Sequence, residues 1–129
     1  MILDTTFIID LLKNKPNAVN RMCSMIEDGV STCITSPTVF ELHSGLVALD
    51  KPEAEKRKII SLLKEQIVYP LDIDSAELAG KIDGDLIRRG LTIDAAACMI
   101  AGIAITHHKK VLTRDEHFKR IDGLRVAEY

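Results

Sequence analysis

The segment from Asp94 to Thr106 constrains the fold of this chain more than any other, because it is apolar on almost every side. A helix that lies on a protein surface has a polar face, and this segment has none. It therefore predicts a helix that is buried against a sheet. Short apolar stretches of the kind that form buried strands lie before and after it.

These stretches alternate with helical patterns along the chain. Strands are predicted at 2–4, 30–35, 67–69, 111–113 and 124–126, and helical patterns at 5–12, 19–26, 38–49, 52–65, 76–87, 94–106 and 117–121. Such alternation predicts an α/β sandwich with a mainly parallel central sheet. The pair 38–49 and 52–65, split by Asp50-Lys51-Pro52, predicts a helical hairpin that projects from the sheet.

The length of 129 residues, of which 47% are hydrophobic, suits one domain over residues 1–129. No stretch approaches the roughly 20 apolar residues that a membrane span needs. The start of the chain lacks the basic and long apolar regions of a secretion signal. We therefore expect a soluble, cytoplasmic protein without a membrane partner.

The cysteines Cys23, Cys33 and Cys98 are odd in number and show no Cys-x-x-Cys spacing. They are predicted to be small buried hydrophobic residues rather than a disulfide framework or a zinc site. The four histidines also lack a His-Glu-x-x-His arrangement. Carboxylates are then the main candidate ligands, which favours a hard cation.

A formal net charge of −2 argues against nucleic-acid binding through global charge attraction. Local binding stays open, because basic residues gather at Lys13/Lys15, Lys56-Arg57-Lys58, Arg88-Arg89, Lys109-Lys110 and Lys119-Arg120. For each cluster alone, a solvated helix face is the preferred interpretation.

Three acids follow predicted strands at the same edge of the sheet. Asp4 ends the first strand, Glu41 lies one helical turn beyond the second, and Asp115 comes just after Val111–Thr113. Ligand sites gather at the carboxyl ends of parallel strands, and oxygen ligands select Mg²⁺ or Mn²⁺. Each acid alone has a structural explanation, as a helix cap or an exposed helix residue. Their joint placement favours a metal site.

Four blocks of the sequence, in order, resemble the PIN-domain VapC toxins: Leu3–Leu12, Thr38–Gly45, Ile100–Ala104, and Leu112–Asp115 with Phe118 and Gly123–Val126. The resemblance implies a three-layer α/β/α sandwich and a Mg²⁺- or Mn²⁺-dependent endoribonuclease, the toxin of a type II toxin–antitoxin system. It also implies a VapB-type antitoxin, a homodimer, and structured RNA such as tRNA or rRNA as substrate. By this match Asp4, Glu41 and Asp115 are metal-site acids, with Thr6 and Thr113 as supporting hydroxyls.

The chain departs from the family pattern at the third acid, where Ala97 stands three positions before Ile100. Asp94 lies one turn earlier on the same helical face, although it is also the expected N-cap. Three interpretations stay open. Asp94 substitutes for the missing acid, the protein is a weakened natural variant, or the alanine was introduced to disarm a toxic nuclease.

Two other functions are compatible with parts of the pattern. A catalytically dead PIN module would bind RNA or an antitoxin through the same surface without cutting. A Mg²⁺-binding receiver domain also has acids at strand ends, but Asp4 is followed by two threonines instead of forming an acidic pair.

The predicted hairpin has more apolar residues than one face of a small domain can absorb: Leu42, Leu46, Leu49, Ile59, Ile60 and Leu63. We expect some of them to contact another chain in a homodimer. With Phe7 and Leu11 of the first helix, they are expected to border a groove for an amphipathic helix of the antitoxin.

Overall fold

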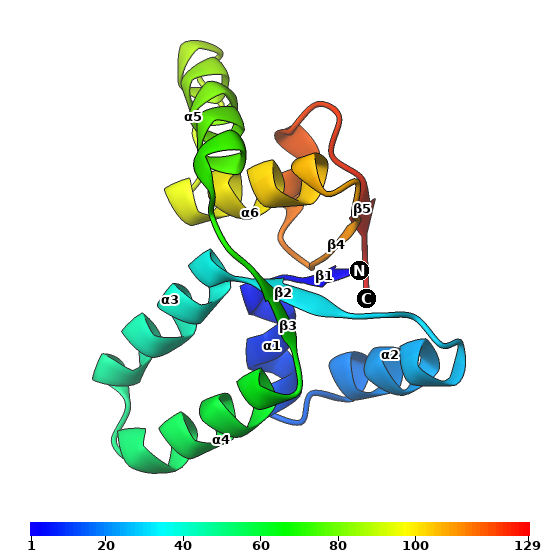
Figure 1. Ribbon diagram of the computed structural model, residues 1–129. Coiled ribbons are helices and arrows are strands. Elements are labelled where there is room, and N and C mark those ends of the chain that lie inside the picture. Colours follow the sequence, from blue (N-terminus) through cyan, green and yellow to red (C-terminus); the bar gives the residue numbers. More distant parts are fainter.

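The computed structural model describes residues 1–129 and contains a five-stranded, fully parallel sheet in the order β3-β2-β1-β4-β5 (Figure 1). The strands are β1 Ile2–Leu3, β2 Cys33–Thr35, β3 Ile67–Tyr69, β4 Val111–Leu112 and β5 Val126–Ala127. The parallel sheet predicted from the sequence is therefore confirmed. Each strand has only two or three residues.

Six α-helices and two 3₁₀ turns connect the strands. They are α1 Thr5–Leu12, α2 Pro16–Glu27, α3 Ser36–Gly45, η1 Leu46–Ala48, α4 Pro52–Lys64, α5 Ile73–Arg88, α6 Ala95–Thr106 and η2 Glu116–Arg120. None of the helices combines the length and the apolar character that crossing a membrane requires.

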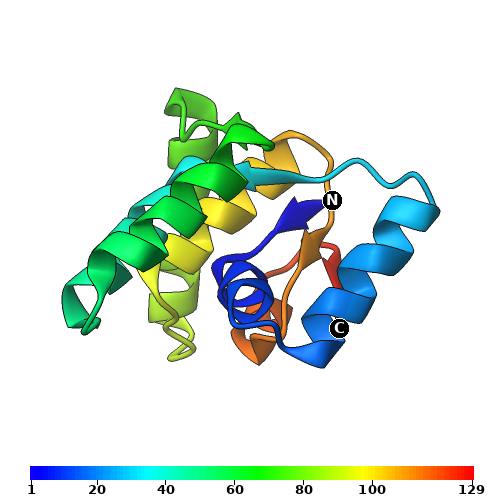
Figure 2. The ribbon, with the colours of Figure 1, turned by 90° about the horizontal axis from the view of Figure 1, so that it is seen from below.

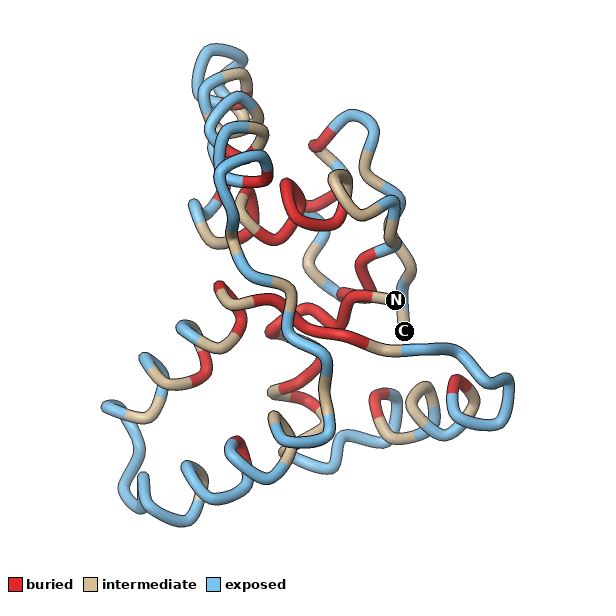
Figure 3. Tube along the Cα trace, viewed as in Figure 1, coloured by how far each residue is buried: buried red, intermediate tan, exposed pale blue.

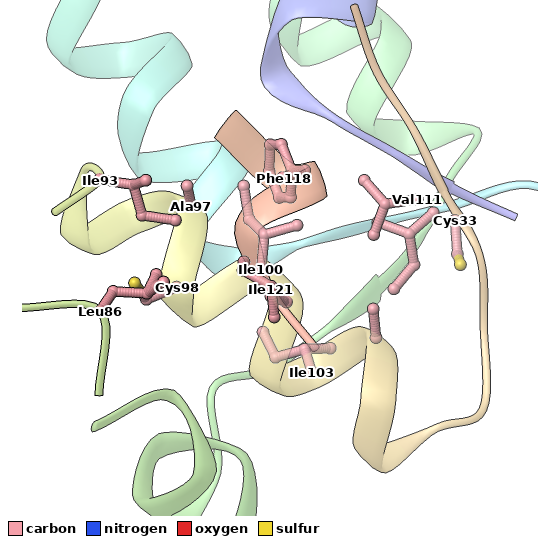
Figure 4. Packing of buried hydrophobic residues seen from close by; sticks show 13 residues of the cluster. Cys33, Leu86, Ile93, Ala97, Cys98, Ile100, Ile103, Val111, Phe118 and Ile121 are labelled. Atoms are coloured by element: carbon pink, nitrogen blue, oxygen red, sulfur yellow. The ribbon is translucent and has the colours of Figure 1, made fainter. Parts of the chain in front are cut away.

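Neighbouring residues of each inner strand enter different cores, because side chains alternate across a sheet. Ile2, Cys33 and Val111 pack with α5, α6 and η2 on one face (Figure 4). Leu3 and Leu112 pack with α1 to α4 on the other. The predicted three-layer α/β/α arrangement is thus confirmed, with the sheet between the two groups of helices (Figure 1).

Helix α6 is buried along most of its length, as its apolar sequence predicts. It lies so close to α5 that a Cβ added at Gly102 would come within 2.5 Å of the Ser75 carbonyl oxygen. Only glycine permits this approach. The packing of α6 fixes the position of its N-cap, Asp94, and of its first turn, which carries Ala97.

The hairpin of α3, η1 and α4 projects from the sheet, with α3 and α4 side by side (Figure 2). Its outer part is largely exposed (Figure 3), and Ile59 is the only buried residue of α4. Val47, in the connection between the two helices, is 92% exposed. The projecting hairpin is therefore confirmed.

Several predicted boundaries were wrong. Strand β2 begins at Cys33 rather than at residue 30, and β5 lies at 126–127 rather than 124–126. Helix α5 begins at Ile73, because the Asp72 side chain accepts a hydrogen bond from the Ser75 backbone N–H and caps the helix there.

Two predictions about burial were also wrong. Cys23 is exposed, because α2 turns Ala18 and Met25 toward the core, whereas Cys33 and Cys98 are buried as expected. Phe7 is fully buried and cannot border a groove for a partner. Leu11, the other residue of the first helix that was predicted to border the groove, is partly accessible.

Candidate functional site

Asp4 lies directly after β1 and is 3% exposed. Its Oδ2 accepts hydrogen bonds from the hydroxyls of Thr6 and Thr113, each at 2.7 Å, and from the Thr6 backbone N–H at 3.3 Å. Asp4 is thus the N-cap of α1. The two predicted supporting hydroxyls hold one carboxylate oxygen, and Oδ1 is left free for another ligand.

Glu41 lies in the second turn of α3, after β2. Its Oε1 accepts a hydrogen bond from the Thr5 hydroxyl at 2.6 Å. Burial raises the pKa of Glu41, and the charges of Asp4, Asp94 and Asp115 raise it further, while the bond from Thr5 opposes them. The four acids, from four separate segments, therefore share one electrostatic neighbourhood.

Asp115 follows β4 and has a structural contact as well. Its Oδ1 accepts a hydrogen bond from the His117 backbone N–H at 2.9 Å, which caps η2, and lies 3.0 Å from His117 Nδ1. The backbone N–H of Asp115 in turn donates to the Thr113 hydroxyl. Asp115 thereby fixes the loop that carries Thr113 toward Asp4.

Asp94 is the N-cap of α6 by backbone geometry, but its side chain makes no capping hydrogen bond. The expectation that capping occupies this carboxylate was wrong. Ala97, at the third position of α6, is 7% exposed and belongs to the apolar cluster, at the same end as Ile93 (Figure 4). Its methyl group supplies no ligand.

No three His, Cys, Asp or Glu side chains stand close enough to hold a metal ion together. The predicted acids therefore share a neighbourhood without forming a compact cage. Magnesium tolerates such a site, since it keeps several waters and takes only one or two carboxylates directly. A donor set of carboxylate and hydroxyl oxygens, with Asp4 Oδ1 free, fits a hard, partly hydrated cation.

Two features of the site were not predicted. Thr5 was not among the predicted site residues, yet its hydroxyl donates to Glu41, 36 residues away in the chain. Asp10, buried in α1, binds Arg114 at 2.6 Å and the Tyr129 hydroxyl at 2.7 Å, and these bonds hold its pKa below the usual range. No local pattern in the sequence signals either contact.

The sheet order and the acidic carboxyl edge agree with the architecture of a PIN-domain protein. Residues 1–124 match the family model described as the PIN domain. The chain belongs to this family. PIN-domain ribonucleases generally need a divalent metal.

The relatives narrow the identification to VapC ribonucleases. The chain is 30% identical to the tRNA(fMet)-specific endonuclease VapC of Shigella flexneri, covering 99% of this chain and 96% of that one. It is 29% identical to ribonuclease VapC1 of Rickettsia felis, covering 98% and 93%. The resemblance to VapC toxins found in the sequence is thus confirmed.

Solved structures of VapBC complexes have the same fold as this chain. DNA-bound VapBC from Salmonella typhimurium matches with a TM-score of 0.87 at 29% identity, covering 98% of this chain and 96% of that one. VapBC2 from Rickettsia felis, bound to a promoter DNA fragment, also gives 0.87 at 22% identity, with coverage of 99% and 97%. At that identity the second match shows the fold alone.

Proposed function

We propose that this protein is a metal-dependent endoribonuclease, the toxin of a type II toxin–antitoxin system, which acts in the cytoplasm as one PIN-like domain over residues 1–129. The observation that carries the proposal is Glu41, a half-buried acid whose pKa is raised among Asp4, Asp94 and Asp115. Acids with raised pKa values at the carboxyl edge of a parallel sheet suit proton transfer and cation binding.

The ion is proposed to be Mg²⁺ or Mn²⁺, held by Asp4 with Asp94 or Asp115. When bound, such a cation lowers the pKa of water and neutralises charge on a phosphate. Thr6 and Thr113 fix the orientation of Asp4. Glu41 keeps Oε2 free of hydrogen bonds and accepts the proton of the attacking water, for which a raised pKa is suited.

The alternative is a catalytically dead module that binds RNA or an antitoxin. Ala97 favours it, because the position expected to carry an acid has a buried methyl group. Asp94 favours the enzyme, because its carboxylate is free of any capping bond and contributes to the raised pKa of Glu41. The activity of this chain therefore depends on two positions, Asp94 at the N-cap of α6 and Ala97 in its first turn.

An apolar groove supports a VapB-type antitoxin as partner. A cavity of about 560 Å³ between α1 and the hairpin is lined by Glu41 and, among others, Ile9, Leu12, Leu42, Leu46, Leu49 and Ile59. An amphipathic helix from the antitoxin, laid along these residues, would cover Glu41. Binding and inhibition would then be one event.

The relatives guide the proposals on substrate and assembly. The Shigella flexneri relative is named as specific for tRNA(fMet). We propose structured RNA, tRNA or rRNA, as the substrate of this chain, and a homodimer as its assembly.

The test is to incubate total RNA with this protein and with the Ala97→Asp variant, each with and without Mn²⁺. Cleavage by Ala97→Asp that requires Mn²⁺ supports the proposal, and added Asp94→Ala shows whether Asp94 contributes. RNA left intact by both proteins in Mn²⁺ would contradict the enzyme and leave the binding module.

A further inference from the structure

A second cavity lies beside α1, where the helix meets the start of α2. Its volume is about 410 Å³, and its lining is almost entirely polar or charged: Asp10, Lys13, Lys15, Pro16, Asn17, Arg114 and Tyr129. Arg114 stands between Thr113 and Asp115 in the chain. The cavity therefore adjoins the acidic edge of the sheet.

The charges in this cavity are not balanced. Both carboxylate oxygens of Asp10 are occupied, Oδ2 by Arg114 Nε and the Tyr129 hydroxyl, and Oδ1 by Arg114 Nη2 at 3.3 Å. The ion pair with Arg114 thus neutralises the one acid of the lining. Lys13 and Lys15 are exposed and form no ion pair, so the cavity has an excess of positive charge.

The start of α2 adds hydrogen-bond donors beside the two lysines. Lys15 is the N-cap of α2 and provides no side-chain acceptor, and Pro16 has no N–H, so the Asn17 backbone N–H lacks a capping side chain. Asn17 of this turn belongs to the cavity lining. The lysine ammonium groups and the Asn17 N–H suit an anion with several oxygens.

We propose that this cavity binds a backbone phosphate of the RNA substrate, away from the bond that is cut; this inference rests on the proposed ribonuclease function. RNA that reaches the acidic edge is repelled by Asp4, Glu41 and Asp115. With a net charge of −2 the protein does not attract RNA globally, so attraction must be local. The cavity supplies this local attraction next to the acidic edge of the sheet.

The groove and the cavity thus receive different molecules. The groove on the hairpin side of α1 has an apolar lining that suits a protein helix. The cavity near α2 offers no comparable apolar surface and contains two unpaired lysines. Lys13 borders both, so a partner in the groove and RNA in the cavity meet at the end of α1.

The test compares two double variants that remove the same charge. Lys13→Gln/Lys15→Gln alters the cavity, while Lys64→Gln/Lys110→Gln alters exposed lysines that precede β3 and β4, at the opposite edge of the parallel sheet. Binding of fluorescently labelled, unfractionated tRNA is measured by anisotropy in EDTA over a range of salt concentrations. Equal melting temperatures establish that the variants are folded.

We expect Lys13→Gln/Lys15→Gln to weaken binding about tenfold at low salt and to reduce the slope of log affinity against log salt by roughly one to two. The control pair should change both values far less. Equal losses in the two double variants would overturn the cavity as a phosphate site and leave the ribonuclease proposal standing. Absence of tRNA binding by the unmodified protein would also overturn the phosphate site, whereas the ribonuclease proposal is tested separately by RNA cleavage in Mn²⁺.

Discussion

Thr5 donates a hydrogen bond to Glu41 across 2.6 Å and thereby joins the first turn of α1 to the second turn of α3. The hydroxyl favours the ionised form of Glu41, against the burial and the neighbouring acids that raise its pKa. Thr5 is therefore a positioning residue. It holds the carboxylate in place and keeps it ionised over a wider range of pH.

Replacing Thr5 with valine should raise the pKa of Glu41 further, because the ionised carboxylate loses a donor. Glu41 must be ionised to accept a proton, so the acid limb of the pH–rate profile should move to higher pH. The profile is measured for RNA cleavage in the Ala97→Asp background. Thr5→Ser keeps the hydroxyl and should retain the parental profile; an equal shift in both variants would contradict the role given to Thr5.

Glu41→Gln should change the pH dependence of stability. The folded-state pKa of Glu41 lies above its unfolded value, so the folded protein loses stability as pH rises from about 4.5 through the folded pKa. Glutamine removes this loss. In metal-free buffer, thermal melts should show Glu41→Gln gaining stability relative to the parent between pH 4 and pH 7. A difference in melting temperature between the two proteins that stays constant from pH 4 to pH 7 would refute this prediction.

Gly102→Ala should destabilise the fold by about 1–3 kcal/mol, because the added Cβ would meet the Ser75 carbonyl and force α5 and α6 apart. Gly84 is a matched control within α5, since it is exposed and has nothing within 4 Å of an added Cβ. Gly84→Ala should stabilise by about 0.5–1 kcal/mol. Urea denaturation measures both, and equal effects would rule out the close helix contact.

Tyr129→Phe should cost about 1 kcal/mol, because it removes the hydrogen bond to Asp10 while keeping the edge-on contact with Phe7. The ring centroids of Phe7 and Tyr129 lie 4.8 Å apart. Tyr129→Ala removes both contacts and should cost clearly more. If phenylalanine and alanine were equally destabilising in urea denaturation, the aromatic contact would contribute nothing.

Leu49→Lys should weaken the proposed homodimer, because it places a charge among the exposed apolar residues of the hairpin. Leu49 is 44% exposed. Ile26→Lys, at a residue 66% exposed on α2, is the control and should leave the assembly unchanged. Light scattering at micromolar concentration measures the mass; a parent that is strictly monomeric there would exclude this dimer surface.

The sequence predicted which strands and helices form better than it predicted the residues at which they begin and end. Short apolar stretches located all five strands, since buried strands must be apolar whatever their exact length. The start of α5 was missed because the helix begins where the Asp72 side chain reaches the Ser75 N–H, three residues along the chain. Such a contact depends on backbone geometry that periodicity does not encode.

The sequence predicted the acids of the candidate site and the hydroxyls of Thr6 and Thr113 beside them, but not the hydrogen bonds that Glu41 and Asp10 accept. Asp4, Glu41 and Asp115 were found because they follow strands, which is a local signal. The bonds from Thr5 to Glu41 and from Tyr129 to Asp10 join residues 36 and 119 positions apart. Only the folded chain brings these partners together, so neither pair has a signature in one sequence.

The edge strand β3 has a consequence for how the protein behaves when it is made in excess. Ile67 is 65% exposed and Val68 is 41% exposed, on a strand with one free edge. A free edge with apolar side chains is a template for adding a strand from another molecule. Glu65, two positions before this strand, places a charge near its entrance and acts as a gatekeeper against such growth into aggregates.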